Sequence, residues 1–171
     1  MNMLDHLLKR NLNPSKYNGV FLDENSATFL LWNLSGELVG YQTYCPSKPK
    51  THGKTPREQR YFTFVSRQDK QVKLAVWGME SYKANKPLYL AEGIFDACRL
   101  HNLGFACVAV LGNNPEHLKS WLATLPNKKI SVCQGDSAGK VLARYGDEAI
   151  YLPSDKDCGD LSDSELLSLL K

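Results

Sequence analysis

The chain has 171 residues, the length of one domain or of two small lobes. With 43% hydrophobic residues, 23% charged residues and a net charge of +3, it has the composition of an ordinary globular protein without low-complexity segments. No apolar run approaches the roughly 18–20 residues that a membrane-spanning helix needs. The first residues lack a basic stretch followed by an apolar one, so we expect a cytoplasmic protein without a signal peptide.

The five cysteines are widely spread and form no CxxC pair. Most of them lie within apolar runs, a pattern typical of buried free thiols in a reducing compartment. The four histidines are equally scattered, so no zinc site can be assembled from local spacing. If the chain holds a metal ion, we expect carboxylates to bind it.

The first half of the chain predicts a short helix followed by an antiparallel β lobe. The helix, Leu4–Asn11, has apolar positions at helical spacing and ends before an Asn-Pro pair. Residues 45–59, rich in Pro, Lys, Thr and Gly, predict a loop, and a turn is expected at 33–36. Apolar, β-rich runs predict strands at residues 19–22, 27–34, 37–44, 60–65 and 72–77.

The pattern changes at Pro87, where strands begin to alternate with helices. Strands are predicted at residues 88–91, 106–111, 129–133 and 149–152, and helices at 92–100, 115–123, 136–145 and 162–170. Asn114 is expected to cap the second of these helices, with Pro115 at its first position. Such alternation predicts a parallel α/β sheet. We therefore expect an α/β protein with a β lobe over residues 1–86 and an α/β domain over 87–171.

Charge is unevenly distributed along the chain. Residues 46–70 are basic, and residues 147–171 are acidic. A basic middle and an acidic end suit a protein that grips phosphates with one part and metal with the other. From charge alone, the simpler interpretation is two solvated surfaces of opposite sign.

Acidic residues follow three of the four predicted parallel strands. Glu92 follows the first strand directly and Asp96 lies one helical turn further on, Asp136 follows the third strand, and Asp157 and Asp160 follow the fourth. Functional groups of parallel sheets collect at the carboxyl ends of the strands, so we expect these carboxylates to lie together. Hard divalent cations prefer such oxygen ligands. Taken singly, each acid could instead be a helix-dipole partner, an N-cap or part of a solvated loop.

Three stretches of the second half resemble the motifs of a known family. LYLAEGIFDACRLHNLGF is similar to the first Toprim motif, in which a strand is followed by Glu-Gly and by an Asp four residues after the Glu. ISVCQGDSAG resembles the second motif, a strand followed by Asp-x-Asp-x-Ala-Gly, and KDCGD resembles the acidic segment that follows in primases. The order and spacing are more similar to bacterial-type DNA primases than to topoisomerases, recombination mediators or maturases.

The first half extends this resemblance. FLLWNLSGELVGYQTY, RYFTF and VWGMESYKANKPLYLAEG are similar to the primase segments that precede the Toprim domain, so the likeness covers roughly Ala27 to Asp163. It implies a small antiparallel β lobe followed by a Toprim domain, which is Rossmann-like with a mostly parallel sheet. It also implies RNA primer synthesis on single-stranded DNA with Mg²⁺ or Mn²⁺, and a replicative helicase as a further partner.

The resemblance also implies a role for particular residues. Glu92 corresponds to the general acid or base of the family. The implied metal ligands are Asp96, Asp136, Asp157 and Asp160, the turn glycines are Gly93, Gly135 and Gly139, and the basic residues for nucleic acid are Lys48, Lys50, Lys54, Arg57 and Arg60.

Two departures from the family pattern bear on function. Gln134 stands where the second motif has its first Asp; an amide oxygen still ligates Mg²⁺, but a neutral ligand weakens a site that works by concentrated negative charge. No zinc-binding module or helicase domain is recognisable, which we interpret as typical of a phage or mobile-element protein.

Three functions remain open from the sequence. The chain is a primase-like nucleotidyltransferase, a Toprim nuclease, or a non-catalytic module that binds nucleic acid or a replication partner. The otherwise complete set of acids favours the nucleotidyltransferase, and Gln134 favours the non-catalytic module. The primase-like β lobe disfavours the nuclease.

Overall fold

A computed structural model describes residues 2–33, 35–51, 53–68, 71–72 and 74–170. Leu34 of the predicted turn, His52, Lys70 of the basic stretch, and Lys73 of the last predicted strand of the β lobe lie outside these residues. The chain folds as two compact units, Met1–Ala75 and Val76–Lys171. Within the described residues, no helix is long and apolar enough to cross a membrane.

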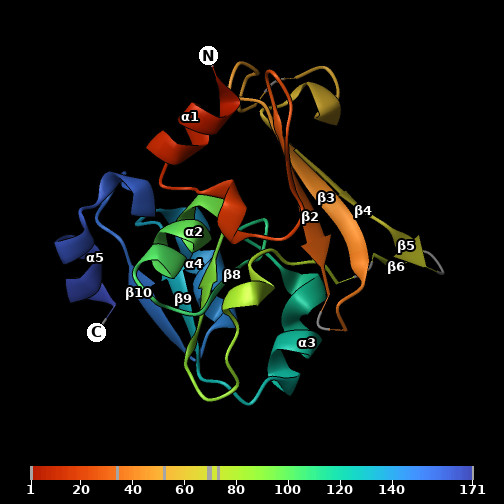
Figure 1. Ribbon diagram of the computed structural model, residues 1–171. Helices are drawn as coiled ribbons and strands as arrows, with labels where there is room; N and C mark the ends of the chain where they lie inside the picture. The colour runs from red at the N-terminus through yellow and green to blue at the C-terminus, as the bar shows by residue number, and fades with distance from the viewer. Residues whose placement is uncertain (1, 34, 52, 69–70, 73, 171) are drawn as a thin grey trace. The chain divides into compact units, whose positions relative to one another are not determined.

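The first unit is built around an antiparallel sheet with the strand order β1-β2-β3-β4 (Figure 1). Its elements are α1 (Met3–Lys9), η1 (Pro14–Lys16), β1 (Val20–Leu22), β2 (Ala27–Trp32), β3 (Leu38–Tyr44), η2 (Pro56–Glu58), β4 (Tyr61–Val65), β5 (Arg67–Gln68) and β6 (Gln71–Val72), where η marks a 3-10 helix. The predicted antiparallel β lobe is thus confirmed.

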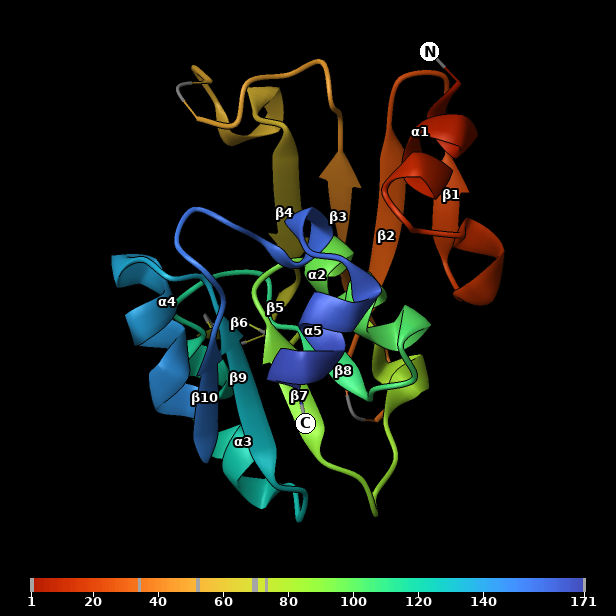
Figure 2. The ribbon, with the colours of Figure 1, turned by 90° about the vertical axis from the view of Figure 1, so that its left-hand side faces the viewer.

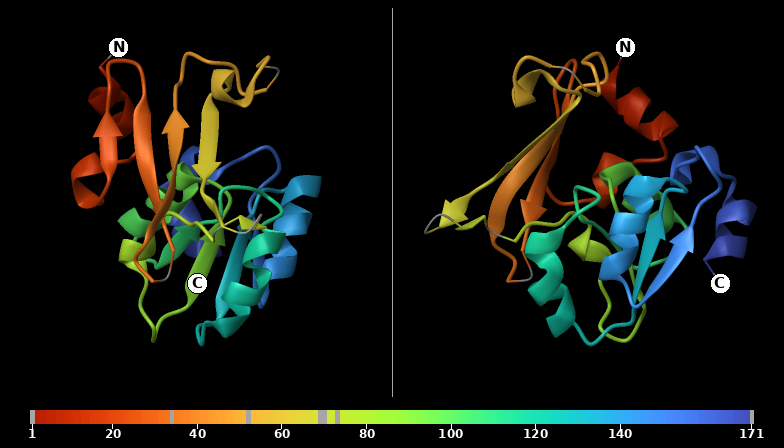
Figure 3. Two further views of the ribbon diagram at one scale, coloured as in Figure 1. Left: turned by 90° about the vertical axis from the view of Figure 1, so that its right-hand side faces the viewer. Right: turned by 180° about the vertical axis from the view of Figure 1, so that it is seen from behind.

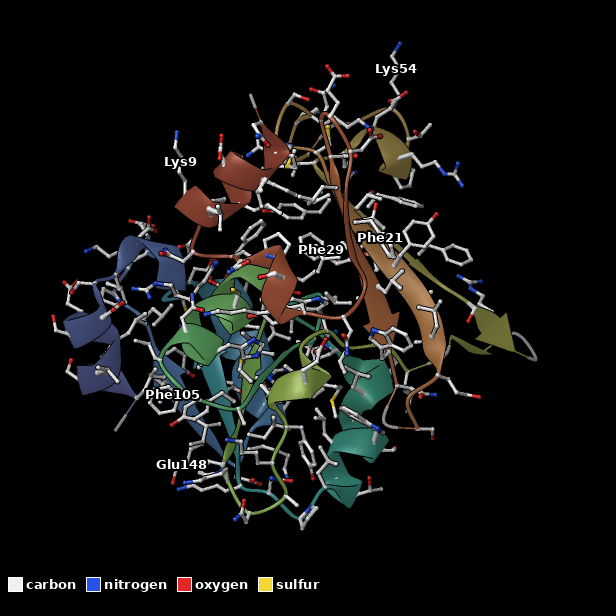
Figure 4. All side chains as sticks on the ribbon, viewed as in Figure 1. Lys9, Phe21, Phe29, Lys54, Phe105 and Glu148 are labelled. Atoms are coloured by element: carbon white, nitrogen blue, oxygen red, sulfur yellow. The ribbon has the colours of Figure 1, made fainter. Side chains whose placement is uncertain are left out.

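One face of this sheet forms the core of the first unit. Side chains alternate along a strand, and along β2 every second residue is buried, with Phe29 at the centre. Helix α1 contributes Leu7 to the same core, and the hydroxyl of Tyr44 contacts His6 Nε2 at 2.8 Å. Figure 4 shows Phe29 on the side of the sheet that α1 covers and Phe21 on the opposite side.

The second unit has a four-stranded parallel sheet with the order β10-β9-β7-β8 (Figure 2). Helices α2 and α5 lie against one face and α3 and α4 against the other (Figure 3). Its elements are η3 (Met79–Ser81), β7 (Leu88–Ala91), α2 (Ile94–Asn102), β8 (Cys107–Ala109), η4 (Glu116–Leu118), α3 (Lys119–Thr124), β9 (Lys129–Cys133), α4 (Ser137–Leu142), η5 (Ala143–Tyr145), β10 (Glu148–Tyr151), η6 (Cys158–Asp160) and α5 (Asp163–Leu169). The predicted parallel α/β sheet is confirmed.

Residues 76–86 pack against the second sheet. Trp77 and Ala109 exchange backbone hydrogen bonds of 3.2 and 2.9 Å, and the Trp77 ring stacks on His101 at a centroid distance of 5.7 Å. The Ser81 hydroxyl accepts a hydrogen bond from the amide of Cys107 at 2.9 Å. The single strand expected at 72–77 is therefore two separate pieces, β6 and a bridge at Trp77.

The domain division after residue 86 marks where the Toprim motifs begin, and it stays a prediction.

Two helix starts differ from the sequence expectation. Helix α2 begins at Ile94 rather than at Glu92, because Gly93 before it is extended, with φ −119° and ψ 163°. Asn114 does not cap the following helix; its side chain accepts a hydrogen bond from the Tyr145 hydroxyl, and Pro115 occupies the N-cap position of η4. Local pattern alone did not reveal the partner of Asn114, which lies 31 residues away.

Candidate functional site

The first acidic motif lies at the carboxyl end of β7. All four residues of this strand are buried, and Glu92 follows them directly. The Glu92 carbonyl accepts a hydrogen bond from the amide of Leu111 at 2.9 Å, which fixes it beside the end of β8. Because α2 starts at Ile94, Asp96 falls in its first turn. Glu92 and Asp96 are therefore both held at this edge of the sheet.

The acidic segment after β10 is fastened to α2. The Cys158 amide donates a hydrogen bond of 3.2 Å to Asp96 Oδ1. Arg99, further along α2, donates to the Leu161 carbonyl at 3.0 Å and forms an ion pair of 2.6 Å with Asp163. The KDCGD segment is therefore held where α2 begins, next to the first motif.

Asp157 and Asp160 cap the short helix η6 between them. Asp157 Oδ1 accepts hydrogen bonds from the Gly159 and Asp160 amides at 2.7 and 3.2 Å. Asp160 Oδ2 in return accepts from the Asp157 amide at 2.9 Å. Asp160 is exposed, whereas Asp157 is partly buried. This arrangement orders the segment and leaves Asp157 as the acid nearer to α2.

The second motif forms the turn from β9 into α4. Asp136 is the N-cap of α4, and its Oδ1 accepts from the Gly139 amide at 2.8 Å. A Cβ atom at Gly139 would lie 1.9 Å from the Gln134 carbonyl oxygen, and one at Gly135 would lie 2.7 Å from the Leu152 carbonyl oxygen. Glycine at these two positions therefore lets backbone segments pass closely.

Gly93 differs from the other two turn glycines. A Cβ atom there would meet only the Asp96 Oδ2 atom at 3.5 Å, an ordinary contact, and its φ is negative. At Gly93, unlike at Gly135 and Gly139, no backbone segment passes within 4 Å of an added Cβ atom.

The acids interact electrostatically in a chain that runs through the three motifs. Burial, and next the charge of Asp136, raise the pKa of Glu92. Burial raises the pKa of Asp96 to about 6, reinforced by the charges of Asp157 and Glu92 and opposed by the hydrogen bond from Cys158. Three pairs of acids therefore repel each other, namely Asp136 with Glu92, Glu92 with Asp96, and Asp96 with Asp157.

The acids nevertheless do not form a complete metal-binding site by themselves. Among the described residues, no three side chains of His, Cys, Asp or Glu converge closely enough to hold an ion by themselves. Gln134, partly buried, follows β9 at the same edge of the sheet. The carboxylates of the three motifs and the Gln134 amide are oxygen ligands, which is the ligand chemistry of Mg²⁺ and Mn²⁺.

Two features of this edge have no sequence signal. Leu111 has a φ of 64°, the left-handed region that non-glycine residues rarely adopt, and its amide binds the Glu92 carbonyl. Such backbone strain clusters at functional sites. The Cys158 amide contacts Asp96 through the backbone, so side-chain identity did not predict it.

The five predicted basic residues lie in the first unit. Lys48 Nζ donates to the Arg57 carbonyl at 2.9 Å, and Arg60 Nε donates to the Lys48 carbonyl at 3.0 Å, so these two side chains order the loop before β4. The Arg57 guanidinium lies over the Phe62 ring, 5.4 Å from its centroid. Lys50 and Lys54 are exposed, and Figure 4 shows Lys54 at the outer end of this loop.

No family model matches the chain, and no curated protein matches its sequence. Several solved structures do match the fold of the chain. The RNA polymerase domain of Mycobacterium tuberculosis primase DnaG is 19% identical, with a TM-score of 0.60, over 97% of this chain and 61% of that one. The primase fragment of the bacteriophage T7 primase-helicase protein is 16% identical, with a TM-score of 0.60, over 88% of this chain and 65% of that one.

A DnaG primase catalytic domain bound to single-stranded DNA is 15% identical, with a TM-score of 0.59, over 97% of this chain and 59% of that one. The chain thus spans about three fifths of the length of these three structures. At identities this low, the similarity shows the fold alone. The fold is that of a primase catalytic core, an antiparallel β lobe followed by a Toprim domain.

Proposed function

We propose that this protein is a primase-like nucleotidyltransferase that joins ribonucleotides on single-stranded DNA with the help of Mg²⁺ or Mn²⁺. The observation that carries this proposal is the chain of mutually repelling acids, Asp136, Glu92, Asp96 and Asp157, at the carboxyl edge of a parallel sheet. Glu92, Asp96 and Asp157 are partly buried, and like charges there cost folding free energy. Asp136 and Asp157 also cap helices, but neither cap requires Glu92 and Asp96 beside it. A site that uses negative charge accounts for their presence.

The oxygen donors of this edge fit a divalent cation. Mg²⁺ in proteins typically takes one or two carboxylates and completes its shell with phosphates and water. Asp96 and Asp157, which repel each other, are the pair that we assign to it first, with Asp136, Asp160 and the Gln134 amide oxygen as further ligands. A bound cation supplies neutralisation of phosphate charge and activation of the attacking oxygen.

Glu92 is the residue to which we assign proton transfer. Burial and the charge of Asp136 raise the pKa of Glu92 towards neutral pH, which favours exchange of a proton during a reaction. In primer synthesis a ribose hydroxyl oxygen attacks the α-phosphorus of the incoming nucleotide, and the bond to pyrophosphate breaks. Glu92 then takes the proton that the hydroxyl loses.

We assign the template to the basic loop of the first unit. Lys50, Lys54 and Arg57 are exposed and suit contacts with phosphates, whereas Lys48 and Arg60 already order the loop by hydrogen bonds. A solved DnaG catalytic domain of the same fold is bound to single-stranded DNA, which supports this assignment. A cytoplasmic location and a replicative helicase partner are part of the same proposal.

A non-catalytic binding module is the second candidate. The observation that favours it is Gln134, a neutral amide where the second Toprim motif has an acid. If Gln134 weakens metal binding, the protein still binds nucleic acid but does not turn over nucleotides. No feature of the described residues favours a nuclease over these two.

One assay separates these functions. The full chain is given a single-stranded template, labelled ribonucleotides and either Mn²⁺ or Mg²⁺, and the products are resolved by length. The proposal predicts new oligoribonucleotides that disappear in Glu92→Ala. Shortened template indicates a nuclease, whereas unchanged template with salt-sensitive binding indicates the binding module. Either of these outcomes overturns the proposal.

A further inference from the structure

Strands β3 and β4 gather aromatic side chains on the face of the antiparallel sheet opposite to Phe29. Tyr41 and Phe64 are directly paired across the two strands, and their rings stack at a centroid distance of 5.4 Å and an angle of 28°. Phe62, two residues before Phe64, lies 6.2 Å from the Tyr41 ring. Because side chains two apart on a strand share a face, Tyr41, Phe62 and Phe64 form one cluster. We call this side the outer face.

The strand register extends the outer face across the sheet. Phe21 on β1 is opposite Thr28, Thr28 is opposite Thr43, and Thr43 is opposite Phe62. One further row runs from Leu30 through Tyr41 to Phe64. The outer face thus carries an apolar and aromatic surface over all four strands.

Part of this surface is open to solvent, whereas Tyr41 and Phe62 are partly buried. Phe21 is 59% exposed and Phe64 is 46% exposed, whereas Phe29 on the other face is fully buried. The solvated face of an antiparallel sheet is ordinarily polar, and a contiguous exposed apolar patch marks an interaction site. These rings are not part of the buried core of the lobe, which lies on the other face.

A shallow hollow lies beside the stacked pair. It has a volume of about 220 Å³ and is lined by Leu30, Leu38, Val39, Gly40, Tyr41, Phe64 and Ser66. One water occupies roughly 30 Å³ in the liquid, so the hollow has room for a flat ring beside Tyr41 and Phe64. A planar ligand seated there gains contact with both aromatic side chains.

Cations border the β4 end of this cluster. The Arg57 guanidinium lies over Phe62, and exposed Lys50, Lys54 and Arg67 flank β4 in the sequence. Glu58 is the single acid between residues 46 and 68, and its carboxylate accepts a hydrogen bond from the Thr55 amide at 3.2 Å. Flat apolar rings bordered by cations match the two parts of a nucleic-acid strand, its bases and its phosphates.

We propose that the outer face is a base-stacking surface for single-stranded nucleic acid, separate from the acidic site of the second unit. Unpaired bases stack on Tyr41, Phe62 and Phe64, while Arg57 and the neighbouring lysines bind the phosphates. Duplex DNA keeps its bases covered and therefore gains nothing from the rings. The choice of nucleic acid as occupant rests on the proposed function, but the stacking is independent of catalysis.

The test is a binding titration of the full chain with end-labelled oligothymidylate, oligouridylate and duplex DNA, read by fluorescence anisotropy. Tyr41→Leu and Phe64→Leu keep an apolar side chain and remove the aromatic face. Each is expected to weaken binding of the single strands by about fivefold or more and to leave duplex binding unchanged. Tyr41→Phe is the matched control, which retains the ring and is expected to bind as the wild type does.

Arg57 gives a second readout through salt. Arg57→Ala is expected to lower the slope of log affinity against log salt by about 0.7 for a single strand, because one phosphate contact is lost. The thermal unfolding midpoint of each variant, measured alongside, excludes loss of folding as the cause. Loss with one kind of single strand but not the other identifies DNA or RNA as the ligand, and either result supports the proposal.

Unchanged single-strand affinity in folded Tyr41→Leu and Phe64→Leu overturns the proposal and leaves the outer face to a protein partner. Equal losses for single strands and duplex also overturn it, since stacking needs unpaired bases. The readout does not depend on the proposed reaction. A protein that stacks bases but makes no primers would refute the proposed function alone, and the reverse result would refute stacking alone.

Discussion

The backbone amide of Cys158 donates a hydrogen bond of 3.2 Å to the carboxylate of Asp96, and so joins two motifs that lie 62 residues apart. The bond satisfies one oxygen of a carboxyl group whose pKa burial and neighbouring acids raise to about 6. Folding therefore places a partly buried charge beside like charges at neutral pH. Asp96 is thus costly for stability, as expected of a residue kept for function.

Replacing this charge is expected to stabilise the metal-free protein. In Asp96→Asn the side chain keeps its shape and still accepts from Cys158, but the repulsion disappears. The free energy of unfolding in chelator at pH 8 should rise by about 2–3 kcal/mol. Urea unfolding measures this change.

The pH dependence of this gain has a definite sign. The pKa of Asp96 is higher in the folded protein than in the unfolded chain, so the wild type loses stability as pH rises from about 4 to about 6. The two proteins should therefore be equally stable below about pH 4 and diverge above it. A variant less stable than the wild type at pH 8 would show that Asp96 supports the fold instead.

Gly139 tests whether the turn after β9 needs glycine. In Gly139→Ala the new methyl group would lie 1.9 Å from the Gln134 carbonyl oxygen, so backbone must shift. We expect the free energy of unfolding to fall by about 3 kcal/mol or more. Gly112→Ala is the matched control, because a Cβ atom there meets nothing within 4 Å. Equal effects of the two substitutions would contradict this account of the turn.

The sequence predicted the parallel sheet well because its strands are short runs that alternate with helical segments, and because β7 and β9 are followed within three residues by glycine and an acid. Glu92 and Asp136 lie at strand ends for this reason, and strand position alone brings them to one edge. The contacts that complete the site could not be predicted in this way. The Cys158 amide and the left-handed Leu111 act through the backbone, which carries no residue-specific pattern.

Patterns at the boundary between the two units were also misleading. Trp77 continues an apolar run and therefore predicted a strand of the β lobe, yet its backbone bridges to Ala109 in the second sheet. Hydrophobic periodicity identifies a strand but does not identify its partner. The faces of β3 show a similar limit. Strand alternation places Tyr41 and Tyr44 on opposite faces, but it does not tell which of the two faces is the core.

Gln134 is expected to limit metal affinity. Gln134→Asp adds a negative charge at the edge where Glu92 and Asp136 already interact, so Mn²⁺ should bind about tenfold more tightly. Isothermal titration calorimetry with Mn²⁺ measures the change. Gln59→Asp, in the first unit, adds the same charge elsewhere and should leave the affinity unaltered. If both variants bind Mn²⁺ as the wild type does, Gln134 does not lie beside the metal.

His101 makes the second unit sensitive to acid. Its Nε2 lies 2.7 Å from the Cys107 carbonyl and donates to it, and burial lowers the pKa of the ring. A histidine whose pKa is lower in the folded protein contributes stability that is lost as pH falls below about 6.5. His101→Gln retains a donor without this titration, so its unfolding free energy should fall less between pH 7.5 and pH 5. Parallel losses in both proteins would contradict this role.

Two matched carboxyl substitutions test whether the acidic edge of the parallel sheet carries out nucleotidyl transfer. Glu92 follows the last residue of β7, whereas Glu148 is the first residue of β10 and lies at the opposite edge, at the same end of the second unit as Phe105 in Figure 4. The measurement is the rate of template-dependent dinucleotide formation with Mn²⁺ in wild type, Glu92→Gln and Glu148→Gln. We expect Glu92→Gln to lose about 10²- to 10⁴-fold in rate, while Glu148→Gln, which breaks only the exposed ion pair with Lys128, keeps the wild-type rate. Equal rates in wild type and Glu92→Gln, or no product from the wild type, would contradict it.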